Sequence, residues 1–301
     1  MKLNKLLFLY LFTAVFMLSC EKDDDGPEVV PPRDRGEQEL KDQAALDEYL
    51  DTHFYNYEEF ETAPEGFDYR IEIDTINAEN AGKTPLSQSP LLETKKFNYE
   101  GVEYTYYVLK VREGASEQPQ PKFSDSTYVS YEGSLLNRNV FDSSQSPVWF
   151  DLTQTIPGFG QAMTEFRGAS SFEVLPDNSV EWSNDYGIGA MFLPSGLGYF
   201  SSFEGDIPSY SPLVFTFNLY RVNEADHDRD GIPSWMEDLD EDKRLINDDT
   251  DGDNAPNYLD RDDDGDFIPT LEEISDEEGN IIFPYPDVDG DGTPDYLDPD
   301  N

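Results

Sequence analysis

The last quarter of the chain most constrains its fold, because it is too acidic to build an ordinary hydrophobic core. Residues 224–301 hold 29 acidic and only 4 basic side chains. Four segments within them share one template, with Asp at positions 1, 3 and 5, Pro at position 8 and a carboxylate at position 12. They begin at Asp226, Asp249, Asp262 and Asp287, so successive starts are 23, 13 and 25 residues apart. This regularity indicates an internal repeat and a separate module.

Carboxylates at this spacing suit a hard cation. Calcium takes six to eight oxygens, and a tight loop supplies them from positions 1, 3, 5 and 12 and from the carbonyl at position 7. The predicted ligands are Asp226, Asp228, Asp230, Ile232 and Glu237; Asp249, Asp251, Asp253, Ala255 and Asp260; Asp262, Asp264, Asp266, Ile268 and Glu273; and Asp287, Asp289, Asp291, Thr293 and Asp298. The alternative is an acidic disordered tail whose charges are simply solvated.

Position 6 of the template separates the loops. Gly231 and Gly292 satisfy the sharp turn expected there, whereas Asn254 and Phe267 do not, so the loop that begins at Asp262 departs furthest. The proline at position 8 and the short spacings resemble thrombospondin type 3 repeats. That resemblance implies structural calcium ions and little regular secondary structure. Without metal the carboxylates would repel one another, so we expect cation binding to drive folding of this module.

The other end of the chain is typical of an exported protein. Lys2 and Lys5 precede an apolar run, Leu6–Leu18, which together predict a signal peptide over residues 1–19. The sequence MLSC, which ends at Cys20, resembles the lipobox of bacterial lipoproteins and implies a lipidated cysteine. More than one acyl chain would anchor the protein stably in a membrane. The acidic residues that follow, Glu21–Asp25, are similar to the surface-export signals of Bacteroidetes lipoproteins.

Residues 20–36 are predicted to form a disordered acidic, Pro-rich tether. Residues 37–96 form a predicted extension that begins with an amphipathic helix and continues with loop and extended segments. The residues expected on one face of that helix are Leu40, Ala44, Leu46, Leu50 and Phe54.

Residues 97–223 are rich in β-branched and aromatic residues and predict an α+β fold, an antiparallel sheet with one short helix across a face. The expected helix is Gly158–Arg167. The expected strands include Thr127–Leu135, Val148–Leu152, Gly189–Leu193 and Leu213–Val222, after a strand that starts near Val102.

Five motifs in this region resemble those of FKBP-type peptidyl-prolyl isomerases, in the same order. They are VSYEGSL from Val129, NVFDSS from Asn139, PVWFDLTQTIPGF from Pro147, FLPSGLGY from Phe192 and IPSYSPLVFTFNL from Ile207. The resemblance implies an FKBP-like sheet and a pocket that grips proline. The implied pocket residues are Tyr131, Phe141, Asp142, Val148, Phe150, Ile156, Phe159, Tyr199, Ile207 and Phe215.

The resemblance also assigns roles within the pocket. Phe159 would form the floor beneath the pyrrolidine ring, Tyr199 would donate its hydroxyl to a substrate carbonyl, and Asp142 with Tyr131 would form a polar edge. Three departures stand out: Phe159 replaces the family's usual tryptophan, no arginine follows FDSS to pair with Asp142, and residues 169–188 form an insertion expected to cover or extend the pocket.

Such a pocket needs no metal, nucleotide or nucleophile. Rotation about an X-Pro bond is slow because amide resonance must be broken, and an aromatic, poorly hydrated pocket can favour the twisted amide. With only His53 and His227 available, and Cys20 assigned to lipid, triad chemistry lacks its parts. The net charge of −45 excludes nucleic acid as a partner.

Three functions remain open at this stage. The first is isomerisation of X-Pro bonds in exported or surface proteins, at the outer membrane, on its surface or periplasmic side. The second is a catalytically weak module that binds proline-containing segments as a chaperone. The third is a structural or adhesive lipoprotein stabilised by its calcium repeats.

Overall fold

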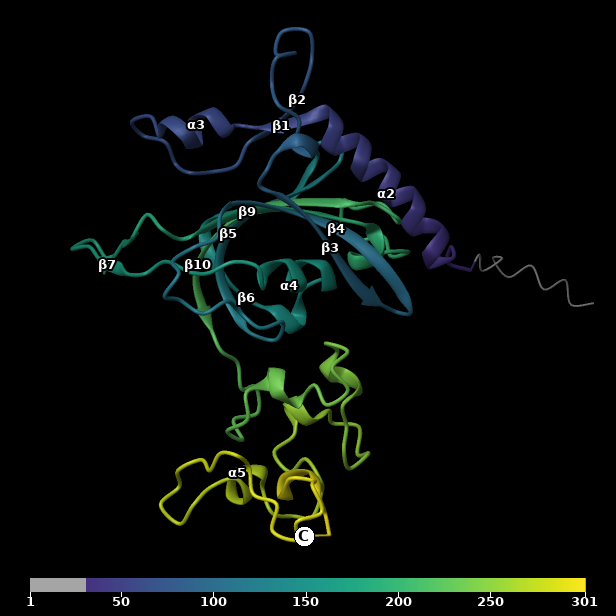
Figure 1. Ribbon diagram of the computed structural model, residues 1–301, viewed down its shortest axis with the longest axis vertical. Helices are drawn as coiled ribbons and strands as arrows, with labels where there is room; N and C mark the ends of the chain where they lie inside the picture. Colours follow the sequence, from purple (N-terminus) through teal and green to yellow (C-terminus); the bar gives the residue numbers. More distant parts are fainter. Residues whose placement is uncertain (1–30, 301) are drawn as a thin grey trace, which may run out of the picture. The chain divides into compact units, whose positions relative to one another are not determined.

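The computed structural model describes residues 31–300, so the predicted signal peptide, Cys20 and most of the predicted tether lie outside the described residues. The chain divides into two units, Met1–Arg33 and Asp34–Asn301, and the second carries the elements in Figure 1. Within residues 31–300, no helix combines the length and the apolar character that crossing a membrane requires.

The second unit contains four helices and ten strands among its described residues. The helices are α2 (Arg35–Thr52), α3 (Tyr57–Thr62), α4 (Pro157–Met163) and α5 (Thr270–Glu273). The strands are β1 (His53–Tyr55), β2 (Ile73–Thr75), β3 (Leu92–Tyr99), β4 (Val102–Arg112), β5 (Ser126–Leu135), β6 (Val140–Asp151), β7 (Phe172–Val174), β8 (Val180–Trp182), β9 (Gly187–Leu193) and β10 (Leu213–Asn223).

Six of these strands form one antiparallel sheet in the order β3-β4-β9-β10-β5-β6, which confirms the predicted α+β class. Its details differ from the prediction. The sheet begins at Leu92, before the predicted boundary at residue 97, and β6 already starts at Val140. Helix α4 ends at Met163 rather than Arg167, because the Arg167 N–H donates to the carbonyl of Glu113 at 2.7 Å instead of continuing the helix.

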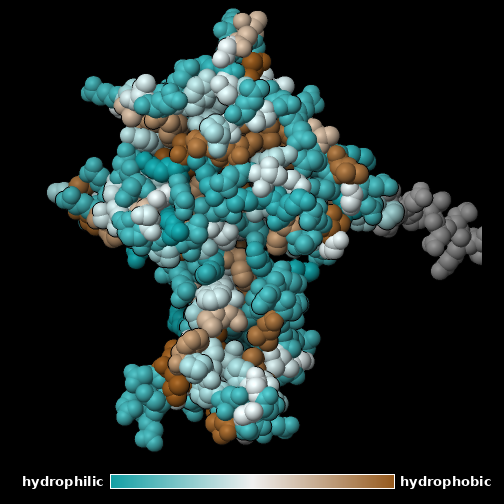
Figure 2. All heavy atoms as spheres, viewed as in Figure 1, coloured by the Kyte–Doolittle hydropathy of each residue, from teal (hydrophilic) through white to brown (hydrophobic). Residues whose placement is uncertain are grey.

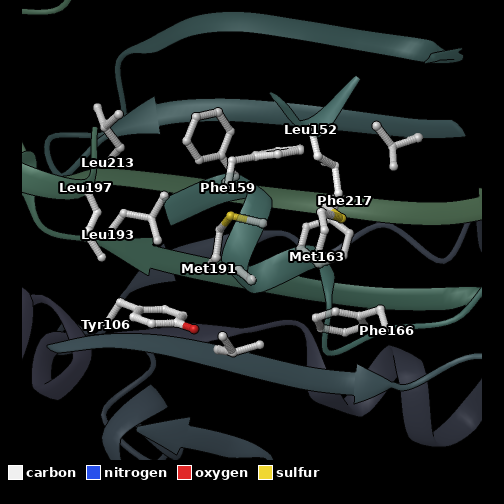
Figure 3. Packing of buried hydrophobic residues seen from close by; sticks show 14 of the residues in the cluster. Tyr106, Leu152, Phe159, Met163, Phe166, Met191, Leu193, Leu197, Leu213 and Phe217 are labelled. Carbon is white, nitrogen blue, oxygen red and sulfur yellow. The ribbon is translucent and has the colours of Figure 1, made fainter. Parts of the chain in front are cut away.

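One face of the sheet carries the core around α4, which Figure 3 shows from close by. Alternate side chains of β5, β9 and β10 point to this face, since successive residues of a strand point to opposite sides. The fully or nearly buried members include Val129, Phe159, Met163, Phe166, Met191, Leu193, Leu197, Leu213, Phe215 and Phe217.

Helix α2 packs on the opposite face through Leu46, Tyr49 and Leu50, which are buried as predicted for Leu46 and Leu50. The predicted face was wrong at Leu40, which is 74% exposed, and at Ala44, which is also exposed. Polar side chains replace them.

Asp42 explains the polar face of α2. It is buried and accepts hydrogen bonds from the backbone N–H of Ser195, at 2.8 Å, and from the amide of Gln38, at 2.7 Å. Phe54 lies beyond the end of the helix, in β1, which pairs with β2.

The acidic segment after β10 has little regular structure, as predicted, apart from α5 and short 3-10 turns. Its small core is built from Ile232, Ile274 and Tyr296. Hydrophilic side chains cover most of the face seen in Figure 2. The segment contacts the sheet domain, where the Ala225 N–H donates to Asp125 at 3.2 Å and Lys243 donates to the side chain of Gln161 at 3.0 Å.

Candidate active site and acidic loops

Aromatic rings from β5, β6, α4 and β10 meet at the open end of the α4 core. Phe159, at 3% exposure, is the central ring. Its centroid lies 5.4 Å from that of Phe215 and 5.6 Å from that of Phe150, and both pairs meet edge to face. Phe141 packs against Phe215 at 5.6 Å, and Tyr131 against Phe150 at 5.0 Å. The structure therefore brings these five predicted residues together.

Gly133 makes this arrangement possible. A Cβ atom at Gly133 would lie 2.6 Å from the Phe141 ring and 2.8 Å from the Phe215 ring, closer than real Cβ contacts allow. The sequence YEG in β5 thus places a ring-bearing residue, Tyr131, beside a gap that two other rings fill. Phe141, Phe150 and Tyr131 remain partly exposed, so one side of the ring cluster faces solvent.

The polar edge of the ring cluster is formed by Tyr131, which donates a hydrogen bond to Asp142. This contact settles the partner of Asp142, for which the sequence offers no arginine. Tyr199 is half-buried against the same core. Burial, together with Glu204 and Asp142, raises the pKa of Tyr199, so its hydroxyl keeps its proton and remains a donor at neutral pH.

The remaining predicted residues occupy the margins. Ile207 is buried in the α4 core and Ile156, the residue before α4, is partly buried against it. Val148 pairs with Val129 on β5 and is half-buried, on the same side of β6 as Phe150. It does not belong to the cluster of side chains that packs around Phe159.

The insertion, residues 169–188, forms the β7–β8 hairpin and does not cover the rings, contrary to expectation. Trp182 contacts Tyr220 and Tyr128, with ring centroids 5.5 and 6.0 Å apart. Tyr220 belongs to the cluster on the α2 face. The hairpin therefore packs on the side of the sheet opposite Phe159.

A cavity of about 530 Å³ also lies away from the rings, between residues 68–74 and strands β5 and β6. Its lining includes Arg70, Asp74, Ser130, Arg138 and Asn218. A pyrrolidine ring is apolar and gains little from such a lining, so the ring cluster is the better candidate for a proline site.

The four acidic loops share one backbone hydrogen-bond pattern. In each, the N–H groups of positions 5, 6 and 7 donate to the carboxylates at positions 3, 1 and 5, at 2.6–3.2 Å. The loop that begins at Asp262 follows the pattern despite Phe267 at position 6. In the loops that begin at Asp226, Asp249 and Asp262, oxygens of the first three aspartates lie within 4.8 Å of one another.

Several of these carboxylates are buried with oxygens that no donor reaches among residues 31–300. Asp230 Oδ2 and both carboxylate oxygens of Glu237 and Asp263 lack a hydrogen bond. Burial and the neighbouring carboxylates raise the pKa of Glu237 to about 10 and that of Asp263 to about 9. Burying carboxylates together without compensation is unfavourable, so the donor set fits a hard cation with oxygen ligands.

Two acidic features escaped the sequence prediction. Asp238, Asp240 and Asp242 form a further group with oxygens within 4.8 Å of one another. Their D-x-D-x-D spacing is visible in the sequence, but Leu245 stands where the template has proline. The second is Asp263, which occupies position 2 of the third loop and joins Asp230 and Glu237 of the first.

Comparison with known proteins agrees with this geometry. The model of the FKBP-type peptidyl-prolyl cis-trans isomerase family matches residues 117–220. A second family model, described as BamM C-terminal, matches residues 227–286.

Several relatives carry the same description. The chain is 28% identical over 164 residues to the FKBP-type peptidyl-prolyl cis-trans isomerase FkpA of Aeromonas hydrophila, covering 54% of this chain and 53% of that protein. It is 29% identical to a probable FkpA of Neisseria meningitidis (47% and 45%) and 30% identical to the outer membrane protein MIP of Legionella longbeachae (35% and 40%). The chain thus spans about half the length, or less, of these relatives.

Among solved structures, a peptidyl-prolyl cis-trans isomerase of Pseudomonas syringae shares 23% identity at a TM-score of 0.34, covering 46% of this chain and 85% of that one. FkpA from Escherichia coli gives the same identity and TM-score, with 46% and 54% coverage. The family model, the relatives and the ordered motifs agree on one region. Residues 117–220 are therefore an FKBP-type peptidyl-prolyl cis-trans isomerase domain.

Proposed function

We propose that this protein catalyses cis/trans isomerisation of X-Pro bonds in exported or surface polypeptides. The observation that carries the proposal is the cluster of rings around Phe159, open to solvent on the side of Tyr131, Phe141 and Phe150. The barrier to rotation is roughly 18–20 kcal/mol and comes from amide resonance. The twisted amide has lost that resonance, so an apolar, rigid surface that fits it better than the planar form lowers the barrier.

Each group at the site has a part in this mechanism. Phe159 supports the pyrrolidine ring, and its edge-to-face contacts with Phe150 and Phe215 hold it in place. Tyr199, protonated at neutral pH, donates to a carbonyl of the bound segment. Asp142, which accepts from Tyr131, keeps that second ring oriented at the polar edge.

The test compares two buried phenylalanines of one core. Phe159→Leu removes the central ring, and we expect kcat/KM on an Ala-Leu-Pro-Phe peptide to fall by about tenfold, which corresponds to about 1.4 kcal/mol of transition-state stabilisation. Phe166→Leu is the matched control, because Phe166 is fully buried in the same core but packs against Phe217, away from the open rings. Equal turnover in the two variants would contradict the proposed site.

We also propose that the acidic loops bind calcium. The support is the shared loop geometry and the buried carboxylate oxygens without donors among residues 31–300. When bound, calcium would neutralise these charges and order a segment that has only a three-residue core. Adding calcium to the full-length chain should slow amide hydrogen exchange between residues 226 and 298. Exchange that is unchanged at millimolar calcium would rule the proposal out.

We further propose that lipid on Cys20 anchors the protein at the outer membrane, on its surface or periplasmic side. The name of one relative, outer membrane protein MIP, supports the location. Incorporation of labelled palmitate that Cys20→Ser abolishes is the expected result. Equal labelling of both proteins would contradict it.

A further inference from the structure

We propose that Asp263, from the third acidic loop, is a ligand of the cation held by the first loop, so that one divalent cation fastens the two loops together. This inference rests on the proposed calcium binding. The first loop spans Asp226–Glu237 and the third spans Asp262–Glu273. Oxygens of Asp230, Glu237 and Asp263 lie within 4.8 Å of one another, although 26 residues separate Glu237 from Asp263 in the sequence.

The burial of these three carboxylates points to a ligand. Each side chain is 1% exposed, and together they present five oxygens that accept no hydrogen bond from residues 31–300. Mutual protonation would not satisfy them, since the carboxyl groups are not hydrogen-bonded to one another at these oxygens. A cation that accepts oxygen ligands over a range of directions would satisfy all five at once.

The position of Asp263 within its own loop supports a role outside it. Position 2 in the other three loops is His227, Thr250 or Val288, so the template needs no carboxylate there. In all four loops the backbone N–H of position 2 donates to the side chain of position 9, at 2.8–3.3 Å. The main chain of Asp263 therefore serves its own loop, while its side chain reaches Glu237 of the first.

The surroundings of the cluster hold the two loops together without the cation. Arg261, next to the third loop, donates from Nε to the carbonyl of Asp228 in the first loop at 2.7 Å. Ile232 of the first loop and Ile274, which follows the third, are fully buried in one small core with Tyr296. This apolar contact excludes water from the carboxylates, and so removes the solvent that would otherwise compensate their charge.

The shared cation gives a prediction for the unaltered full-length chain. Because the first and third loops share a ligand set, their amide protection should appear together during a calcium titration followed by hydrogen exchange. Protection of the two loops at calcium concentrations that differ by more than about threefold would overturn the proposal. A chain that does not respond to calcium at all would overturn the proposed calcium binding as well, so the two failures are distinguishable.

The variant Asp263→Asn tests the ligand directly in the full-length chain. It keeps the shape of the side chain, and we expect at least a tenfold weaker calcium affinity for the first loop, with reduced protection of residues 226–237. Glu278→Gln, an exposed carboxylate of the same segment, is the matched control for the loss of one charge. An Asp263→Asn effect confined to residues 262–273, or equal to that of the control, would show that Asp263 serves only its own loop.

Discussion

Phe267 occupies position 6 of the third acidic loop with a backbone φ of 78°, and its side chain is 93% exposed. The other loops have Gly231, Asn254 and Gly292 at this position, all with positive φ. A left-handed phenylalanine costs about 1–2 kcal/mol, while glycine adds about 0.5–1 kcal/mol of chain entropy to the unfolded state. Phe267→Gly should therefore raise the free energy of unfolding by up to about 1 kcal/mol in saturating calcium, measured with urea.

Phe203→Gly is the control for that substitution. Phe203 is 70% exposed, and its backbone lies outside the left-handed region. Glycine there relieves no strain and should lower stability by about 0.5–1 kcal/mol. The strain argument fails when both variants lower stability by the same amount.

Glu39 should make stability depend on pH. Its Oε1 accepts from the Thr105 N–H at 2.9 Å, and burial raises its pKa from 4.5 to about 7. The folded state therefore binds the proton more tightly than the unfolded state. Stability from this group is present below pH 4.5 and is lost as the pH rises through about 7. Glu39→Gln keeps the acceptor and should be more stable than the parent by about 1–3 kcal/mol at pH 8.

Urea unfolding of the parent and Glu39→Gln at pH 4.5 and pH 8 measures this difference, which should be small at the lower pH. Glu37→Gln, an exposed position on the same helix, corrects for the general loss of negative charge. A Glu39→Gln curve parallel to that of the parent across this range would show that Glu39 does not titrate as described.

At the scale of elements, strand alternation located β5, β9 and β10 almost to the residue, since each has one buried apolar face that only one register satisfies. Alternation could not reveal the buried face of α2. That face is polar, and Asp42 is satisfied by Ser195, which lies 153 residues away. The pocket rings were predictable as an ordered motif set, whereas Asp263 was not, because its cluster forms only when two loops meet.

The β7–β8 hairpin gives the element-scale prediction. Trp182 packs its ring against Tyr128, Phe172 and Tyr220, on the face opposite Phe159. Trp182→Ala should lower the free energy of unfolding by about 1–3 kcal/mol, less than for a fully buried tryptophan because Trp182 is half-buried. Peptide turnover at 25 °C should stay within about twofold of the parent. A larger loss of turnover in the folded variant would place the hairpin in the proline site.

At the scale of the whole molecule, the two candidate sites are neighbours in the chain but are built from separate residues. His227, in the first acidic loop, lies 3.3 Å from Asp151, and Asp151 directly follows Phe150 of the ring cluster. The rings themselves belong to β5, β6, α4 and β10, and they are held by the sheet core rather than by the acidic segment. The structural support for the rings therefore does not depend on cations.

This separation makes the last prediction, which concerns removal of calcium from the full-length chain. Chelation should speed hydrogen exchange throughout residues 226–298, because the carboxylates then repel one another. Turnover of a proline tetrapeptide should stay within about twofold, because Phe159, Phe150 and Phe215 keep their core contacts. The comparison needs equal ionic strength, since a chain of net charge −45 responds to salt alone. A loss of turnover that calcium restores and magnesium does not would mean that the His227 contact transmits cation occupancy to Phe150.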